Sequence, residues 1–137
     1  MHYKIHAIDV KNALKNYIWL LEDTTTQEVV VIDPTDADLV TAFCEQHQLV
    51  LKQIWLTHWH RDHTDGVHGL LAKQKILVYG PRDELSKISF ISNPLQHNDH
   101  FHFNDLKVEI IATPGHTLGH IVYFIEEIDT LFCGDTL

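Results

Sequence analysis

The sequence predicts one α/β domain over residues 1–137, and three of its features support that prediction. Apolar segments with the alternation of strands are interleaved with segments of helical periodicity. Three of the expected strands run directly into turns that carry histidine or aspartate. Repeats, low-complexity stretches and linker-like composition are absent from the sequence, so a division into several domains is not expected.

The first half of the chain alternates between strand-like and helix-like apolar patterns. Bulky residues that alternate along the chain favour strands, whereas apolar residues spaced by three or four positions favour helices. The expected elements are, in chain order, strands at 17–22 and 28–33, a helix at about 36–47, a strand at 51–56 and, after the turn Thr64-Asp65-Gly66, a helix at 67–74.

The second half is predicted to consist mainly of strands. Asn104-Asp105 separates two alternating segments and predicts a hairpin, whereas Gly80-Pro81 and the 92–94 segment are typical of a turn and a loop. The expected elements are a strand at 76–79, a short helix at 83–88, the hairpin of 100–103 and 106–113, and strands at 121–126 and 130–133.

Composition and charge argue against several classes of function. With 45% hydrophobic and 21% charged residues the chain has a globular profile, and no apolar run approaches the ~20 residues of a membrane span. The net charge of −9, with only 10 basic residues, argues against a nucleic-acid partner. The N-terminus lacks the apolar region of a signal peptide. Cys44 and Cys133, both expected to be packing residues, are too few for a disulfide framework, so a cytoplasmic location is expected.

The most informative segment is the loop after the 51–56 strand, where His58, His60, Asp62 and His63 form an H-x-H-x-D-H pattern. Neutral imidazole is the commonest metal ligand in proteins, and carboxylates complete such sites. Crowded imidazoles without a metal would repel one another when protonated and would leave buried nitrogens unpaired. The pattern therefore predicts a metal site, in which His58 and His60 face one ion while Asp62 and His63 are available to a second.

Two further strand ends carry candidate ligands. The 106–113 strand runs into Pro114-Gly115-His116, and the 130–133 strand runs into Gly134-Asp135. Either turn alone is ordinary loop chemistry. Because sites in α/β sheets assemble beyond the carboxyl ends of the strands, His116 and Asp135 are expected to join the same metal site.

Three motifs together make the chain resemble the metallo-β-lactamase superfamily and, within it, the glyoxalase II (hydroxyacylglutathione hydrolase) family. They are NYIWLL at 16–21, which is similar to the family's first strand, ATPGHTLGH at 112–120 and FCGDTL at 132–137. The H-x-H-x-D-H loop is common to the whole superfamily, whereas the combination of the three motifs is typical of glyoxalase II. The resemblance implies an αββα sandwich, of which this chain would form only the N-terminal half.

The resemblance also assigns ligands residue by residue. His58, His60 and His116 would bind the first metal, and Asp62 and His63 the second. Asp135 would bridge the two. The implied cofactor is Zn²⁺, two per complete site, with iron or manganese as alternatives. The metal loop offers no cysteine ligand, which disfavours a β-lactam substrate.

By the same resemblance the substrate would be S-D-lactoylglutathione or a related hydroxyacylglutathione, hydrolysed to D-lactate and glutathione in methylglyoxal detoxification. Bound metal would activate a water, and Asp62 would orient that water and accept its proton. The thiolate leaves readily, because a thiol has a pKa of about 8.5. The alternatives are another hydrolase of this fold such as a lactonase, a persulfide dioxygenase, or a metal-binding chain without turnover.

The family's remaining second-site histidine, its glutathione-binding residues and its helical substrate domain would lie downstream of Leu137. Three expectations follow for the 137 residues alone. The second metal site should be weak or empty, an apolar sheet face should drive self-association, and thioester hydrolysis should be poor or absent.

The other histidines are expected to play structural roles. His97, His100 and His102 are predicted to be exposed side chains around the hairpin rather than a second metal site, because no carboxylate or thiol accompanies them in ligand spacing on their face. His120, just before the 121–126 strand, is expected to hydrogen-bond near the ligands rather than to bind metal.

Overall fold

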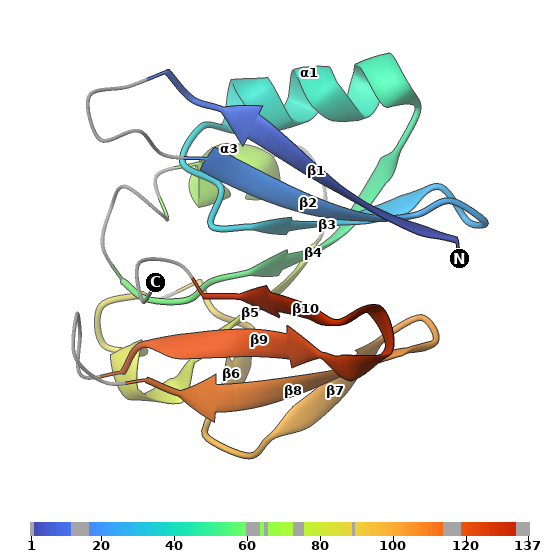
Figure 1. Ribbon diagram of the computed structural model, residues 1–137. Helices are drawn as coiled ribbons and strands as arrows, with labels where there is room; N and C mark the ends of the chain where they lie inside the picture. Colours follow the sequence, from blue (N-terminus) through green and yellow to red (C-terminus); the bar gives the residue numbers. More distant parts are fainter. Residues whose placement is uncertain are drawn as a thin grey trace. The chain divides into compact units, whose positions relative to one another are not determined.

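The computed structural model describes residues 2–11, 17–59, 64, 66–72, 76–88, 90–113 and 119–133. The chain divides into two compact units. The first comprises Met1–Trp55 and His60–Val78, and the second comprises Leu56–Trp59 and Tyr79–Leu137. Each unit contains its own hydrogen-bonded strands (Figure 1). Each also has its own buried apolar side chains.

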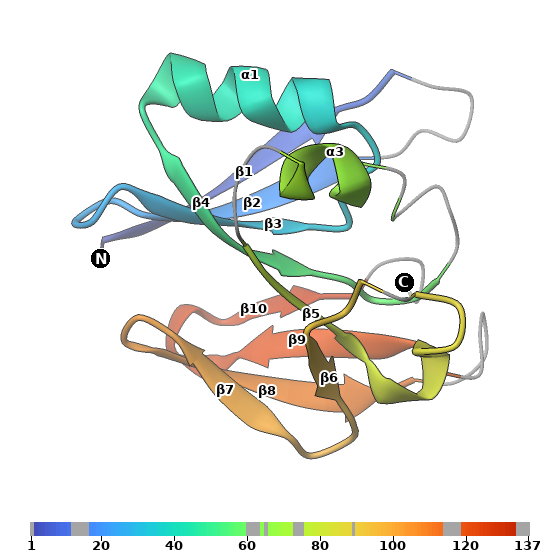
Figure 2. The ribbon, with the colours of Figure 1, turned by 180° about the vertical axis from the view of Figure 1, so that it is seen from behind.

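In the first unit four strands are hydrogen-bonded in the order β1-β2-β3-β4. Two antiparallel pairs join β1 (Tyr3–Asp9) to β2 (Tyr17–Asp23) and β2 to β3 (Glu28–Ile32), and β3 runs parallel to β4 (Val50–Trp55). A parallel pair requires a crossover connection, which the helix α1 (Ala37–His47) supplies. Figure 1 shows α1 along one face of these strands, and Figure 2 shows the short helix α3 (Val67–Leu71) beside α1.

Local chemistry explains where α1 begins and ends. The Asp36 carboxylate accepts a hydrogen bond from the Leu39 N–H at 3.1 Å, as an N-cap does. Gln48, at φ 58°, ends the helix in the left-handed region, and its N–H donates to the carbonyls of Cys44 and Glu45. Cys44 and Val40 lie on the buried face of the helix.

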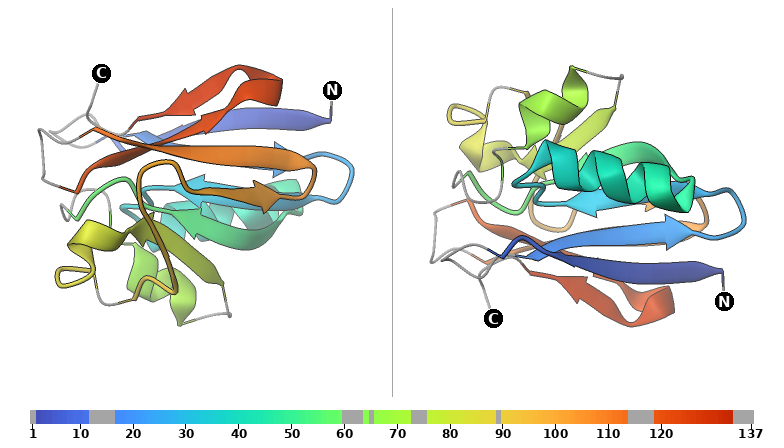
Figure 3. Two further views of the ribbon diagram at one scale, coloured as in Figure 1. Left: turned by 90° about the horizontal axis from the view of Figure 1, so that it is seen from below. Right: turned by 90° about the horizontal axis from the view of Figure 1, so that it is seen from above.

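The second unit contains an antiparallel sheet in the order β10-β9-β8-β7. Its strands are β7 (His100–Phe103), β8 (Leu106–Ala112), β9 (Ile121–Ile125) and β10 (Thr130–Phe132), seen from below in Figure 3. A further strand, β5 (Leu77–Pro81), passes from the first unit into the second after Val78, and its second half runs parallel to β6 (Asn93–Leu95). Two 3₁₀ turns, η1 (Arg82–Glu84) and η2 (Glu126–Ile128), follow β5 and β9.

Most of the expected elements are confirmed. The strands at 17–22, 28–33, 51–56, 121–126 and 130–133 correspond to β2, β3, β4, β9 and β10, and the expected 36–47 helix is α1. The hairpin forms in the expected register, with Phe103 opposite Leu106 across Asn104-Asp105. The second helix begins at Val67 as expected and ends at Leu71, while residues 73–75 lie outside the described ranges.

Three local expectations were wrong. Gly80-Pro81 belongs to β5 rather than to a turn, because Gly80 leaves room for Ile91, whose Cδ1 would lie 2.7 Å from an added Cβ. Asn93 and Pro94 of the expected 92–94 loop lie in the end strand β6, where a proline is tolerated. The expected 83–88 helix is the single 3₁₀ turn η1. In addition, the strand β1, which the sequence analysis did not expect, precedes β2.

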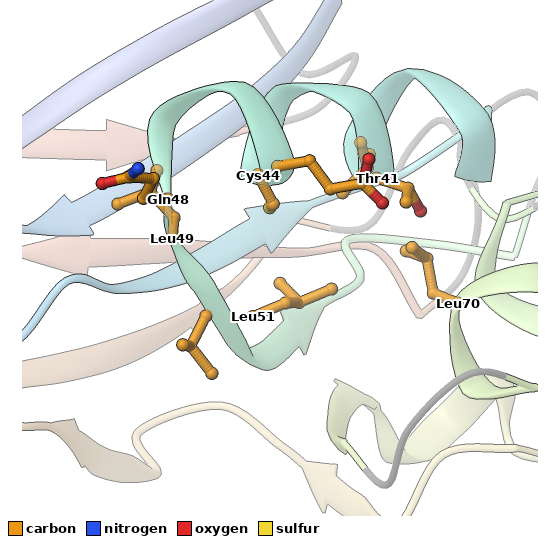
Figure 4. Close-up of a pocket in the computed structure, with 9 residues that line it drawn as sticks. Thr41, Cys44, Gln48, Leu49, Leu51 and Leu70 are labelled. Carbon is orange, nitrogen blue, oxygen red and sulfur yellow. The ribbon is translucent and has the colours of Figure 1, made fainter.

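Among the described residues, no helix combines the length and apolarity needed to cross a bilayer. A cavity of about 330 Å³ lies within the first unit, where side chains of α1, β4 and α3 converge (Figure 4). Cys44, Leu51 and Leu70 are among its lining residues. His58, the one predicted metal ligand among the described residues, is not one of its lining residues.

Candidate metal centre

One of the six predicted ligands, His58, lies within the described residues. The other five, His60, Asp62, His63, His116 and Asp135, fall outside them, so their placement as ligands stays a prediction. Within the described ranges alone, no group of three or more histidine, cysteine, aspartate or glutamate side chains could hold a metal ion. The geometry of the centre is therefore built from His58 and from the residues that frame the ligand-bearing segments.

His58 lies three residues beyond the end of β4, on the loop expected to bind metal, and its side chain is fully buried. Its Nδ1 is hydrogen-bonded to the Thr57 hydroxyl at 2.9 Å. In the tautomer that protonates Nδ1, the ring lone pair is on Nε2. A hydrogen bond to one ring nitrogen orients the other toward a metal, and histidine ligands commonly use this arrangement.

His120 is the second fully buried histidine of this region. Its ring stacks on that of His58, with 4.9 Å between the centroids and 23° between the planes. Its Nδ1 is hydrogen-bonded to the Thr113 hydroxyl at 2.9 Å, so each of the two rings is hydrogen-bonded to a threonine. His120 thus has a hydrogen-bond partner and lies beside His58, while its role next to metal ligands stays a prediction.

Backbone hydrogen bonds hold the segments that carry the two rings. The Ile121 N–H donates to the Thr57 carbonyl at 3.0 Å, and the Thr113 N–H donates to the His120 carbonyl at 2.8 Å. The buried Tyr123 hydroxyl donates to the Leu56 carbonyl at 2.6 Å. These contacts fix the residues just before His58 and on both sides of the 114–118 segment, which includes His116.

Glu84 is a buried charged residue that the sequence analysis did not identify. Its side chain is 3% exposed, and its Oε2 accepts a hydrogen bond from the Gly119 N–H at 3.0 Å. Glutamate is almost never fully buried unless it has a partner, so this burial is informative. The sequence gives no sign of it, because the segment around Glu84 is rich in charged residues.

The far end of the metal loop is fixed in the first unit by Gly66. Its N–H donates to the Pro34 carbonyl at 2.8 Å. A Cβ at this position would lie 2.7 Å from that carbonyl oxygen and 2.9 Å from the backbone nitrogens of Asp36 and Ala37. These are backbone atoms at the start of α1, so only glycine fits without moving the helix.

A cation–π contact flanks the metal loop in the second unit. The Lys87 ammonium lies 4.5 Å from the centroid of the Trp59 ring, and Trp59 directly follows His58. Cation–π contacts contribute on the order of 0.5–1 kcal/mol at exposed sites, so this one helps to orient the loop without dominating its energy.

The histidines around the hairpin are exposed, as expected. His100 and His102 lie with their ring centroids 6.3 Å apart and their planes at 83°. His97 accepts a hydrogen bond at Nδ1 from the Ala112 N–H at 3.0 Å. No described carboxylate or thiol completes a metal-binding group with them.

The two cysteines are both free thiols. Cys44 is buried, which confirms its predicted place in the core, and Cys133 is half-buried. Burial, together with the negative charge of Glu45, raises the pKa of the Cys44 thiol to about 11. A thiol with so high a pKa is a poor nucleophile and a poor metal ligand at neutral pH.

The donor chemistry of the chain fits a divalent metal. His58 is a buried imidazole with a hydroxyl partner on Nδ1, and the predicted set around it combines histidine nitrogens with carboxylate oxygens. This combination suits zinc, iron or manganese. His58, His60 and His116, with Asp62, His63 and Asp135, are the residues that would hold such ions.

Comparison with known proteins agrees with the motifs. The model of the metallo-beta-lactamase superfamily matches residues 12–137. A hydroxyacylglutathione hydrolase of Shewanella oneidensis is 40% identical, with 97% of this chain and 51% of that protein covered. One of Hahella chejuensis is 44% identical, with 89% and 47% covered. The resemblance to that family is thus confirmed, and the chain spans about half the length of these curated relatives.

Solved structures identify the fold. The BLEG-1 B3 metallo-beta-lactamase matches with a TM-score of 0.85 at 23% identity, covering 98% of this chain and 73% of that chain. ETHE1 from Myxococcus xanthus matches with a TM-score of 0.83 at 26% identity, covering 98% and 58%. On this evidence the chain has the metallo-β-lactamase fold and belongs to the metallo-β-lactamase superfamily, membership of which implies a divalent-metal centre.

Proposed function

We propose that this chain contributes the metal-binding part of a hydroxyacylglutathione hydrolase, which hydrolyses S-D-lactoylglutathione to D-lactate and glutathione in the glyoxalase pathway. The observation that supports the proposal is the 40–44% identity to relatives of that name over 89–97% of this chain. The metallo-beta-lactamase and ETHE1 structures share the fold at only 23% and 26% identity. Hydrolysis of a glutathione thioester is therefore favoured over the reactions of the metallo-beta-lactamase and of ETHE1.

In the proposed site His58, His60 and His116 would hold the first metal, Asp62 and His63 would hold the second, and Asp135 would serve both. We propose zinc as the metal, with iron or manganese as alternatives. When bound, the metal would lower the pKa of a water molecule and polarise the thioester carbonyl of the substrate. The second ion is expected to bind weakly or not at all to the 137 residues alone, because only Asp62, His63 and Asp135 are available to it and the family's remaining histidine would lie downstream.

In the proposed mechanism Asp62 orients the attacking water and accepts its proton. His58 presents a ring that cannot rotate freely, since it is buried, stacked on His120 and bonded to the Thr57 hydroxyl. The leaving group needs little help from a general acid, because a thiol has a pKa of about 8.5 and leaves as the thiolate. The proposed partner is thus a small-molecule glutathione thioester. We also propose a cytoplasmic location, since free cysteines suit a reducing compartment.

The proposal can be tested by joining Leu137 to the downstream part of the Shewanella oneidensis relative, which aligns with this chain over about half its length. Loaded with zinc, the fusion should hydrolyse S-D-lactoylglutathione and should lose most of that turnover on Asp62→Asn. The matched control is Asp83→Asn, an exposed carboxylate outside the predicted ligand set. A metal-loaded, folded fusion that cleaves a β-lactam but no glutathione thioester would contradict the assignment.

A further inference from the structure

The buried carboxylate of Glu84 is a polar group to which the proposed reaction assigns no role. It lies on η1, and its Oε2 accepts the hydrogen bond from the Gly119 N–H at 3.0 Å. Its Oε1 is also buried and has no hydrogen-bond partner among the described residues. Burying a carboxylate costs free energy, so an arrangement that retains one calls for an explanation.

Gly119 fits closely against this carboxylate. A Cβ added to Gly119 would lie 2.4 Å from Glu84 Cγ, 3.0 Å from Glu84 Cδ and 3.1 Å from Asp83 Cβ. Any side chain at this position would push the loop away from η1 and break the hydrogen bond. Glycine at 119 and glutamate at 84 therefore make one specific contact between residues 35 positions apart in the sequence.

The place of Gly119 in the chain gives the contact its significance. Gly119 directly follows the 114–118 segment, which contains His116, and directly precedes His120, which stacks on His58. Thr113, at the other end of that segment, is hydrogen-bonded to the backbone and the ring of His120. Glu84 thus holds the backbone of Gly119, the residue that directly precedes His120.

We propose that Glu84 is a positioning residue of the metal centre, acting through Gly119 on the adjacent His120, whose ring stacks on that of His58. This inference rests on the proposed metal site. Groups that orient metal ligands typically change metal affinity by about 10–100-fold when they are replaced, although they do not touch the metal. A purely structural carboxylate would instead change stability and leave the affinity of the folded chain unaltered.

Metal affinity of the folded 137-residue chain separates these two roles. Zinc affinity would be measured by competition with a chromophoric chelator, and the ligand field by the visible spectrum of the cobalt form. Glu84→Ala is expected to lower zinc affinity about 10–100-fold and to alter the cobalt spectrum. Glu84→Gln should restore affinity to near the wild-type value, because the glutamine carbonyl can accept the same Gly119 N–H.

Two matched controls accompany these variants. Asp83→Ala removes a neighbouring exposed carboxylate of the same turn, and Val108→Ala destabilises the core of the same unit. Both should leave zinc affinity unchanged. If Glu84→Ala does not fold, Glu84→Asp takes its place, since the shorter side chain keeps the charge but no longer reaches Gly119, and it should lose affinity in the same way.

Each outcome decides the matter. Wild-type affinity in Glu84→Ala or Glu84→Asp, or equal losses in Glu84→Gln and Glu84→Ala, would overturn the positioning role while leaving the metal site in place. A wild-type chain that binds no zinc would instead contradict the proposed function, and with it this inference. Loss in Glu84→Ala with rescue in Glu84→Gln would support both.

Discussion

Two pairs of histidines in the second unit differ in almost every physical respect. His58 and His120 are fully buried, stacked at 4.9 Å and each bonded to a threonine hydroxyl. His100 and His102 are exposed, and their rings are nearly perpendicular at 6.3 Å. Both pairs come from histidine-rich segments of sequence. The difference teaches that histidine density alone does not decide whether a ring is buried and hydrogen-bonded or exposed to water.

The physical basis of this difference is the cost of burial. A buried ring with a polar nitrogen lowers stability unless that nitrogen is bonded, so the Thr57 and Thr113 hydroxyls are part of what makes the buried pair tolerable. An exposed ring bonds to water and requires no such partner. Four predictions test how far the contrast extends, beginning with the largest expected effect.

Replacing both His58 and His116 by alanine is expected to abolish binding of the first metal, because a site with three protein ligands does not survive the loss of two. Elemental analysis after dialysis should show no bound metal in this double variant. The double variant His100→Ala, His102→Ala removes the same number of imidazoles and should keep the wild-type metal content. Equal metal content in the two double variants would show that His58 and His116 bind metal no better than the exposed His100 and His102.

Replacing His120 by alanine is expected to lower the free energy of unfolding by about 2–4 kcal/mol. The substitution opens a cavity, and the Thr113 hydroxyl loses its buried hydrogen-bond partner. Zinc affinity should fall at least about 10-fold, because the His58 ring loses its stacking neighbour. Urea unfolding of the metal-free chain and chelator competition measure the two effects. His102→Ala should change stability by less than about 0.5 kcal/mol, and a comparable loss there would contradict the contrast.

Burial also predicts how Cys44 responds to pH. Burial, with the charge of Glu45, raises the pKa of its thiol from 9.0 to about 11. Well below pH 9 the Cys44 thiol is protonated in both the folded and the unfolded chain. Between pH 9 and 11 the unfolded chain loses this proton first, so stability should fall as pH rises, and less steeply in Cys44→Ala. At pH 8 alkylation of Cys44 in the folded chain should be about 100-fold slower than in urea, and equal rates would refute the shift.

The smallest effect is expected at His97. Its alanine variant loses one exposed hydrogen bond, the 3.0 Å contact from the Ala112 N–H, which water can replace. The free energy of unfolding should therefore fall by less than about 1 kcal/mol, and metal content should stay constant. A loss of bound metal in this variant would show that the exposed histidines contribute to a site after all.

Elements with strong local signals were predictable from the sequence. The hairpin of β7 and β8 forms around Asn104-Asp105, and α1 begins at the capping residue Asp36, because turns and caps depend on a few neighbouring residues. β1 was missed because it is an end strand on which most side chains are exposed or half-buried, so its pattern lacks a clear apolar face. β6 was missed because Asn93-Pro94 is a turn signal in most contexts.

The candidate site likewise has features that depend on local sequence and features that depend on long-range contacts. The position of His58 after β4 follows from a motif of adjacent residues and could be predicted. The contact between Glu84 and Gly119 joins residues 35 positions apart, and nothing in either local sequence indicates it. The stacking of His58 on His120 is equally non-local. Candidate ligands that lie in motifs are therefore accessible to sequence reasoning, whereas the long-range contacts around them are visible only in the folded chain.

Gly66 illustrates what this means for mutational tolerance. It carries no reactive group, yet any side chain there would meet three backbone atoms of the Pro34 to Ala37 turn within 3 Å. A library of all substitutions at Gly66 should thus be depleted as severely as one at a ligand, although the cause would be loss of folded protein rather than loss of bound metal. Screens that score activity alone would count this glycine as part of the catalytic machinery, and a parallel measurement of soluble yield would reclassify it.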